Sequence, residues 1–178
     1  GITEFIICCG HMGYVIKEYF ANYFLHMSDI TIDMSTNQME VHHKNAEPWK
    51  VTLVDTGDIT QTGGRIKRIK EHINGTFCLT YGDGLCDIDI NQLIRFHKIQ
   101  GTEVTVTAIQ PAGRYGAIEI AESRVITFIE KPRGDGNWIS GGYFVCEPDI
   151  FERIEGDHTI WEQEPLEGLA GENQLAVF

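Results

Sequence analysis

The sequence predicts an α/β fold in which helices flank a mixed, mainly parallel central sheet. One observation behind this prediction is a largely apolar segment, residues 76–81, that ends abruptly in Gly82-Asp83-Gly84. An apolar run of this length bounded by glycines is typical of a buried, parallel strand. The other observation is that strand-like and helix-like segments alternate from the start of the chain. A chain of 178 residues is expected to form one domain.

Composition narrows the function classes. The net charge of −12 disfavours a broad nucleic-acid-binding surface, although a few local cations and a metal can still hold a nucleotide. No apolar run approaches the roughly 20 residues that span a bilayer, and the first residues do not resemble a Lys/Arg-led secretory signal. The five cysteines are predicted to be mostly small core residues in a reducing cytoplasm rather than zinc ligands. We therefore expect a cytoplasmic protein with neither nucleic acid nor membrane as a partner.

The first elements are predicted to be a strand, a helix and a hairpin. Residues 1–10 indicate a turn and an apolar strand, and residues 14–25 have the apolar spacing of a helix. Alternating segments on either side of polar residues 35–38 predict the hairpin, and residues 51–55 predict the next strand. The aromatic residues around Tyr19 suggest a helix face packed on protein. That protein is either a neighbouring subunit or, more simply, the ordinary core.

A loop rich in glycine and threonine, residues 56–64, leads into a predicted helix at 65–73. The buried face of this helix is predicted to contain Ile66, Ile69 and Ile73. Its solvated face is predicted to contain Lys67, Arg68 and Lys70. A glycine-rich segment that opens a helix is a plausible anion site. Arg65, in the first turn, would oppose the helix dipole, so an anionic ligand explains this cation better than helix stability does.

The remaining elements follow from capping residues and alternation. Asp87-Ile88-Asp89 is predicted to cap a helix at 90–100, which Gly101 ends. The glycine pair Gly141-Gly142, inside a strand at 138–146, permits a ligand to approach the backbone closely. The other predicted elements are strands at 103–109, 117–120 and 125–129, a loop at 111–116, a turn at 134–136, a helix that starts within 148–154 and a strand at 174–178.

Asp83 is the residue with the clearest chemical meaning. In open α/β sheets the ligand crevice lies beyond the carboxyl ends of the strands, so Asp83 would stand at its rim. Its flanking glycines remove side chains that would block a ligand. A carboxylate there can hold Mg²⁺ against phosphate oxygens. The alternative is a tight Asp-Gly turn with no function beyond reversing the chain.

Taken together, these motifs resemble the sugar-1-phosphate nucleotidyltransferase family, and within it the branch that transfers cytidylyl groups. The elements Tyr81-Gly82-Asp83-Gly84 and Glu130-Lys131-Pro132 are shared by the wider family. The segment from residue 14 to residue 58 points to the cytidylyl branch. The stretches most specific for the resemblance are residues 16–29, 47–49, 51–57, 62–65, 81–84, 130–132 and 161–165.

The resemblance implies a Rossmann-like nucleotidyltransferase fold, with residues 1–178 as a single catalytic domain and a helix-hairpin insertion around residues 14–50. It implies transfer of a cytidylyl group from CTP to glucose 1-phosphate, giving CDP-glucose and pyrophosphate, with Mg²⁺ as cofactor. It further implies a homo-oligomer that supplies a nucleotide sugar for O-antigen and lipopolysaccharide. Relative to the family, a glycine-rich phosphate loop is expected before Gly1 and a second metal-binding aspartate beyond Phe178. The activity of these 178 residues alone is therefore left open.

Site residues follow from the resemblance position by position. Asp83 matches the family's catalytic strand-end aspartate that binds Mg²⁺, and Gly82 lies on the nucleotide side. Thr60 and Arg65 match loop positions that bind CTP.

The sugar phosphate has its own set of matching positions. Glu130 and Lys131 match the pair that holds the sugar hydroxyls and the phosphate, and Lys131 would also orient the nucleophile in catalysis. Gly116 matches a glycine that lies against the hexose, and Gly142 belongs to the predicted substrate site. Ser140 departs from the asparagine that is common in relatives, so its contact is not implied.

Two other function classes are open. A metal-dependent nucleotide-sugar glycosyltransferase would use an Asp-x-Asp motif, which Asp87-Ile88-Asp89 fits, although these residues also serve as a helix cap. The third possibility is an inactive relative that still binds sugar phosphates, which the expected lack of the glycine-rich loop favours.

Overall fold

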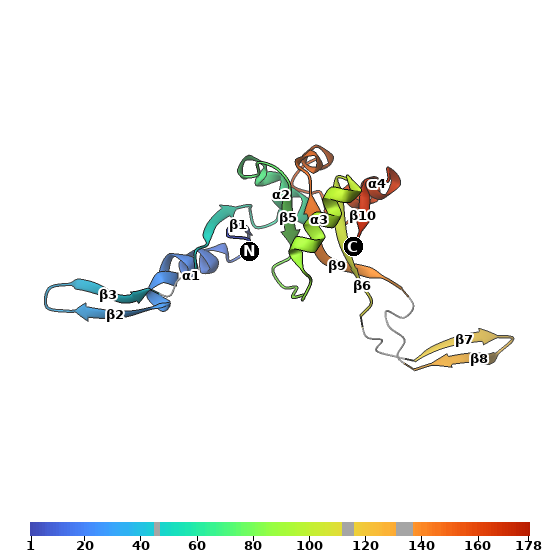
Figure 1. The fold of residues 1–178 in the computed structure, drawn as a ribbon, viewed down its shortest axis with the longest axis horizontal. Coiled ribbons are helices and arrows are strands. Elements are labelled where there is room, and N and C mark those ends of the chain that lie inside the picture. Colours follow the sequence, from blue (N-terminus) through green and yellow to red (C-terminus); the bar gives the residue numbers. More distant parts are fainter. Residues whose placement is uncertain (45–46, 112–115, 131–136) are drawn as a thin grey trace. The chain divides into compact units, whose positions relative to one another are not determined.

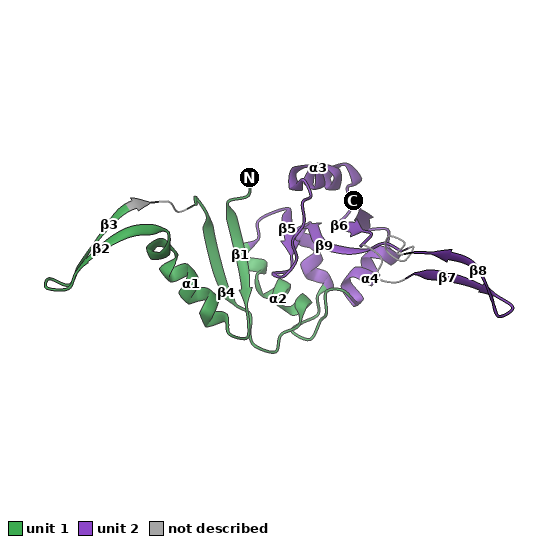
Figure 2. Cartoon of the chain, turned by 90° about the horizontal axis from the view of Figure 1, so that it is seen from below, with its two compact units in different colours: residues 1–72, 154–162 green, residues 73–153, 163–178 purple. Residues whose placement is uncertain are grey.

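The computed structural model describes residues 1–44, 47–111, 116–130 and 137–178 (Figure 1). These residues form two compact units (Figure 2). The first unit contains residues 1–72 and 154–162, and the second contains residues 73–153 and 163–178. The chain therefore passes between the units three times.

The first unit is built on two parallel strands, β1 (Glu4–Cys9) and β4 (Lys50–Asp55), which pair from Glu4 opposite Lys50 to Cys9 opposite Asp55. Helix α1 (Gly13–His26) follows β1 and contacts both β1 and β2. Strands β2 (Ser28–Asp33) and β3 (Gln38–Lys44) form the predicted antiparallel hairpin, which extends beyond α1 in Figure 1. The predicted strand, helix and hairpin are all confirmed.

The turn of this hairpin is closed by the side chain of Asp33. Its Oδ1 accepts hydrogen bonds from the Ser35 hydroxyl at 2.6 Å and from the Ser35 N–H at 2.8 Å. These bonds, the hydroxyl first, lower the pKa of Asp33 to about 2. The polar turn therefore fixes the register in which alternating strand residues face one another.

Helix α2 (Thr62–Arg68) begins three residues earlier than predicted and is followed by the short 3₁₀ helix η1 (Lys70–His72). The predicted loop glycines are buried inside the helix. A Cβ on Gly63 would lie 2.8 Å from the Thr159 carbonyl oxygen, and one on Gly64 would lie 2.6 Å from the Cα of Asp157. The glycines thus allow α2 to pack against residues 154–162.

The prediction that Lys67, Arg68 and Lys70 form a solvated face is confirmed for Arg68 and Lys70, which are exposed, and wrong for Lys67, which is half-buried. Lys67 Nζ donates to the carbonyl oxygens of Ile154 and Glu155. The Arg68 guanidinium donates to both carboxylate oxygens of Asp157, at 2.9 and 2.6 Å. Both cations therefore hold α2 to the returning segment 154–162. The buried positions Ile66 and Ile69 are confirmed.

The second unit contains a four-stranded sheet in the order β10-β6-β9-β5. Strand β10 is parallel to β6, whereas β9 is antiparallel to both β6 and β5. Three strands thus share one direction and β9 is reversed, which makes the sheet mixed, as predicted. The strands are β5 (Phe77–Thr80), β6 (Val104–Ile109), β9 (Ile139–Cys146) and β10 (Leu175–Val177).

The strand that precedes Asp83 differs from its prediction. It was expected to be buried and to have parallel neighbours, but β5 lies at an edge of this sheet and pairs antiparallel with β9. Successive side chains of a strand point to opposite faces of the sheet, so the residues of β5 alternate between half-buried Phe77 and Leu79 and exposed Cys78 and Thr80. Of the cysteines predicted to be core residues, Cys9 and Cys146 are buried.

Helix α3 (Ile90–Gln100) has the predicted ends. Asp89 Oδ1 accepts from the N–H groups of Asn91 at 2.9 Å and Gln92 at 3.2 Å, and Gly101 ends the helix with φ +66°. Prediction and structure differ at η3 (Pro148–Arg153), which is 3₁₀ helix rather than α-helix. The remaining elements are the antiparallel pair β7 (Ala117–Ala121) and β8 (Arg124–Ile129), which was predicted, and α4 (Glu164–Gly171).

The core of the second unit lies where α3, η3 and α4 meet the sheet. Phe77 of β5 stacks on Phe151 of η3 with ring centroids 5.8 Å apart. Fully buried apolar side chains of this unit include Leu93, Val104, Phe144, Val145, Ile150 and Leu169. Among the described residues, no helix has both the length and the apolar character needed to cross a membrane.

Candidate functional site

Asp83 lies in the loop that follows β5, with its side chain exposed. A Cβ on either neighbouring glycine, Gly82 or Gly84, would meet no atom within 4 Å. The carboxylate is therefore open to a ligand from both sides. The loop position at the carboxyl end of a strand agrees with the sequence expectation.

The donor chemistry of Asp83 suits Mg²⁺, which prefers oxygen ligands and is often bound through one or two carboxylates together with phosphate oxygens. In the part of the chain that the structure describes, no cluster of three or more His, Cys, Asp or Glu side chains could hold a metal.

Gly142, on β9, supports the Asp83 loop from the sheet. Its φ of +76° is a conformation that other residues rarely adopt, and a Cβ there would lie 3.0 Å from Tyr81 Cδ2. The next residue, Tyr143, donates its hydroxyl hydrogen to the Gly84 carbonyl oxygen at 2.7 Å. The structure thus brings Gly82, Asp83 and Gly142 into one part of the second unit.

Gly116 and Glu130 come together at the open end of the β7–β8 hairpin. A Cβ on Gly116 would lie 2.7 Å from Phe128 Cζ and 3.2 Å from Glu130 Oε2. Because Gly116 has no side chain, the Glu130 carboxylate and the Phe128 ring can both lie close to its backbone. Such a pair can bind a sugar, the carboxylate through the hydroxyls and the ring through the apolar face. Lys131 and the predicted turn at 134–136 lie outside the described residues.

Arg65, in the first unit, is held in place by the loop that follows β4 rather than by a helix N-terminus. It lies in the last turn of α2, so the prediction that it stands in the first turn is wrong. Nη1 donates to Thr56 Oγ1 at 2.7 Å, and Nη2 donates to the Asp58 carbonyl oxygen at 3.3 Å. The guanidinium packs on Gly10, where a Cβ would lie 2.3 Å from Nη1.

Thr60 is buried within the loop that joins β4 to α2. Its side chain is 6% exposed and packs between Gly57 and Gly64, whose Cβ atoms would lie 2.9 and 2.7 Å from it. Thr60 and Arg65 therefore belong to one packed structure around the loop that joins β4 to α2.

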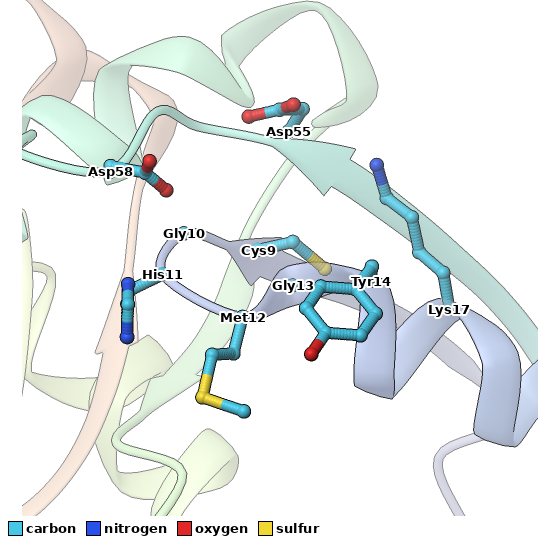
Figure 3. A pocket seen from close by; sticks show the side chains of 9 residues that line it. All are labelled: Cys9, Gly10, His11, Met12, Gly13, Tyr14, Lys17, Asp55 and Asp58. Carbon is cyan, nitrogen blue, oxygen red and sulfur yellow. The ribbon is translucent and has the colours of Figure 1, made fainter.

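A cavity of about 390 Å³ opens beside Arg65, at the carboxyl ends of β1 and β4. Figure 3 shows Asp55 and Asp58 on one side, the loop from Gly10 to Gly13 on the other, and Lys17 extending from α1. The cavity offers a ligand hydrogen-bond acceptors in the two carboxylates, donors in the Lys17 ammonium group, and an apolar surface in the Met12 side chain. The lining residues are Cys9, Gly10, His11, Met12, Gly13, Tyr14, Lys17, Asp55 and Asp58.

Sequence reasoning did not find this cavity. The available signal was the glycine pair Gly10 and Gly13 directly after an apolar strand, with Asp55 at the end of the next parallel strand. Parallel strands end at the same edge of a sheet, so these residues could have been expected to meet.

Asp89, the second aspartate of the Asp-x-Asp motif, is occupied as a helix cap. Besides the two N–H groups that bind Oδ1, the Gln92 side chain donates to Oδ2 at 3.1 Å. These bonds, led by the Gln92 N–H, lower the pKa of Asp89. The helix cap explains Asp89, so this residue gives the glycosyltransferase hypothesis no specific support.

Comparison with known proteins gives three findings. The family model described as nucleotidyl transferase matches residues 14–170. Glucose-1-phosphate cytidylyltransferase of Salmonella typhimurium is 57% identical over all of this chain and 70% of its own length. A probable glucose-1-phosphate cytidylyltransferase of Bacillus subtilis is 40% identical over the same shares.

Solved structures agree at the level of the fold. HddC from Yersinia pseudotuberculosis superposes with a TM-score of 0.66 at 20% identity, covering all of this chain and 70% of that one. An identity this low supports the α/β nucleotidyltransferase fold alone.

Proposed function

The chain belongs to the nucleotidyl transferase family, and we propose that it transfers a cytidylyl group from CTP to glucose 1-phosphate, giving CDP-glucose and pyrophosphate. The observation that supports this most strongly is the 57% identity to a glucose-1-phosphate cytidylyltransferase over the whole chain. The protein is accordingly an enzyme of the nucleotidyltransferase class.

The reaction is an in-line displacement at the α-phosphorus of CTP. A phosphate oxygen of glucose 1-phosphate forms the new P–O bond, and the bond to the bridging oxygen breaks as pyrophosphate leaves. Positioning and neutralisation of charge provide most of the catalysis in such transfers. When bound, Mg²⁺ would neutralise phosphate charge beside the Asp83 carboxylate.

We assign the substrate contacts by position. Arg65, fixed by Thr56, faces the phosphates or base of CTP, with Thr60 shaping the same loop. Gly82 and Gly142 leave room beside Asp83 for the substrate. Gly116 and Glu130 contact the hexose, and Lys131 holds its phosphate and orients the attacking oxygen.

Further assignments rest on the family. We propose that the two units together form one catalytic domain with an insertion around residues 14–50, that Mg²⁺ is the cofactor, and that the enzyme is a cytoplasmic homo-oligomer. Supply of CDP-glucose for O-antigen and lipopolysaccharide is the biosynthetic role that this activity predicts.

The test is release of pyrophosphate by the purified protein with glucose 1-phosphate and Mg²⁺, comparing CTP, UTP and dTTP. We expect release with CTP and little with the other two. Asp83→Asn, purified in parallel, is the matched control and should lose the activity, because an amide is a far poorer metal ligand than a carboxylate.

Two outcomes would contradict the proposal. Transfer of glucose from CDP-glucose without pyrophosphate would indicate a glycosyltransferase. No release with any nucleotide, while glucose 1-phosphate still binds in calorimetry, would indicate an inactive binding protein.

A further inference from the structure

We propose that Tyr143 is a positioning residue for Asp83, because its hydroxyl fixes the loop that presents this carboxylate to a divalent metal. The inference rests on the proposed function, since that function gives Asp83 its metal. None of the family motifs in the sequence includes Tyr143.

The first step of the argument is the place of Tyr143 in the sheet. On β9 it pairs with Thr80, the last residue of β5, so its side chain starts where the Asp83 loop leaves the sheet. Its hydroxyl donates to the Gly84 carbonyl oxygen at 2.7 Å, across 59 residues of sequence. The bond therefore anchors the backbone directly after Asp83 to a central strand.

The backbone before Asp83 is held by the neighbours of Tyr143. The Tyr81 ring packs on Gly142, where a Cβ would lie 3.0 Å from Cδ2. The same ring meets Phe144 edge to face, with centroids 6.1 Å apart and an angle of 86°. Three consecutive residues of β9 thus hold the loop on both sides of Asp83. Gly142 and Phe144 do so by packing against Tyr81, whereas Tyr143 does so through the hydrogen bond from its hydroxyl.

The loop needs such an anchor because its own sequence is permissive. Gly82 and Gly84 have open space where a Cβ would be, and glycine loses more backbone entropy on ordering than any other residue. If the loop is already ordered, metal binding does not have to supply the free energy of ordering it, so the metal binds more tightly. A phenol is protonated at neutral pH even at its ordinary pKa of about 10, and hydrogen bonding with the Cys86 side chain raises the pKa of Tyr143 further, so the hydroxyl keeps its hydrogen.

The test is Tyr143→Phe, which removes the hydroxyl and keeps the ring. In the metal-free protein we expect faster amide hydrogen exchange in peptides covering residues 82–86, by about three- to tenfold for one lost hydrogen bond. The Mg²⁺ concentration for half-maximal pyrophosphate release should rise by about the same factor, while the KM for glucose 1-phosphate stays within about twofold.

Tyr23→Phe is the matched control, since Tyr23 donates its hydroxyl to exposed Glu47 in the first unit. It should change neither measurement. Parental exchange in Tyr143→Phe would overturn the inference, and so would faster exchange with an unchanged Mg²⁺ midpoint.

Asp83→Asn separates this inference from the proposed function. If Asp83→Asn keeps the parental Mg²⁺ midpoint, the metal role of Asp83 fails and the positioning role of Tyr143 fails with it. If Asp83→Asn loses pyrophosphate release, as the proposed function expects, while Tyr143→Phe behaves as the parent, only the role of Tyr143 is overturned.

Discussion

At the scale of single residues, Thr56 determines where Arg65 can point. Thr56 is fully buried, and its N–H and its hydroxyl both donate to the Cys9 carbonyl oxygen, at 2.7 and 2.8 Å. The hydroxyl oxygen in turn accepts from Arg65 Nη1. A planar guanidinium held by such a bond keeps its remaining donors in a fixed direction.

Thr56→Val should therefore weaken CTP binding while it preserves the fold. Valine has the shape of threonine without the hydroxyl, so Arg65 loses its anchor and Cys9 keeps the backbone bond. We expect the KM for CTP to rise about three- to tenfold, the effect of one hydrogen bond, with the KM for glucose 1-phosphate unchanged.

Thr36→Val, at an exposed hairpin turn, is the control and should leave both constants unchanged. An unchanged KM for CTP in Thr56→Val, with a parental melting temperature, would show that Arg65 does not depend on Thr56.

At the scale of elements, Arg153 joins three parts of the second unit. From the end of η3 it donates to both oxygens of Glu103, at 2.7 and 2.6 Å, and to Glu172 at 2.8 Å. Glu103 directly precedes β6 and Glu172 directly follows α4. Because the guanidinium bond to Glu103 is bidentate and only partly exposed, it contributes more than an ordinary surface pair.

We predict that Arg153→Lys lowers the free energy of unfolding by about 1–2 kcal/mol, because an ammonium group cannot reproduce the bidentate geometry. Denaturant titration of the two proteins measures the difference. Arg95→Lys, at an exposed position of α3, should fall within about 0.5 kcal/mol of the parent. Equal losses in both variants would mean that the Arg153 geometry is not the cause.

The same ion pairs make this effect depend on pH. Hydrogen bonding to Arg153 lowers the pKa of Glu172 below its ordinary value of 4.5. A carboxylate with a depressed pKa stabilises the folded state above its ordinary pKa, and this contribution is lost as the pH falls through the folded value. The stability difference between the parent and Arg153→Lys should therefore be constant near neutral pH and shrink below about pH 4.5.

Local patterns predicted some elements and distant contacts decided others. The ends of α3 were predictable because Asp89 and Gly101 act within one turn of the helix. The start of α2 was not, because Gly63 and Gly64 are poor helix formers, and the packing on residues 154–162 that favours them comes from far along the chain.

The candidate site divides in the same way. The position of Asp83 in the loop after β5 could be predicted because a glycine-flanked aspartate at a strand end is a local signal, whereas its role in metal binding stays a prediction. Tyr143 and Thr56 could not, since their partners are set by strand pairing, across 59 residues for Tyr143 and Gly84. The environment of Lys131 was predicted from family motifs alone and stays a prediction.

At the scale of the whole molecule, the aromatic face of α1 is the strongest sign of a partner subunit. Tyr19 contacts Phe20 and Tyr23 with ring centroids 5.3 and 5.6 Å apart, and Tyr23 reaches Trp49 at 6.3 Å. Tyr19 nevertheless stays 53% exposed and Trp49 46% exposed. The helix face that was expected to be core is therefore a cluster of aromatic rings that is partly exposed to solvent. Large exposed apolar patches often mark protein–protein contacts.

We predict that the protein is a homo-oligomer and that Tyr19→Glu weakens its assembly, because a charge at the centre of an apolar interface loses its hydration on association. Sedimentation equilibrium should give the parent a multiple of 20.1 kDa and the variant a smaller average mass. Ala21→Glu is the matched control, since a residue two positions along a helix points to its opposite side. A parent mass of 20.1 kDa would make the homo-oligomer prediction wrong, whereas equal loss of assembly in both variants would place the interface elsewhere than at Tyr19.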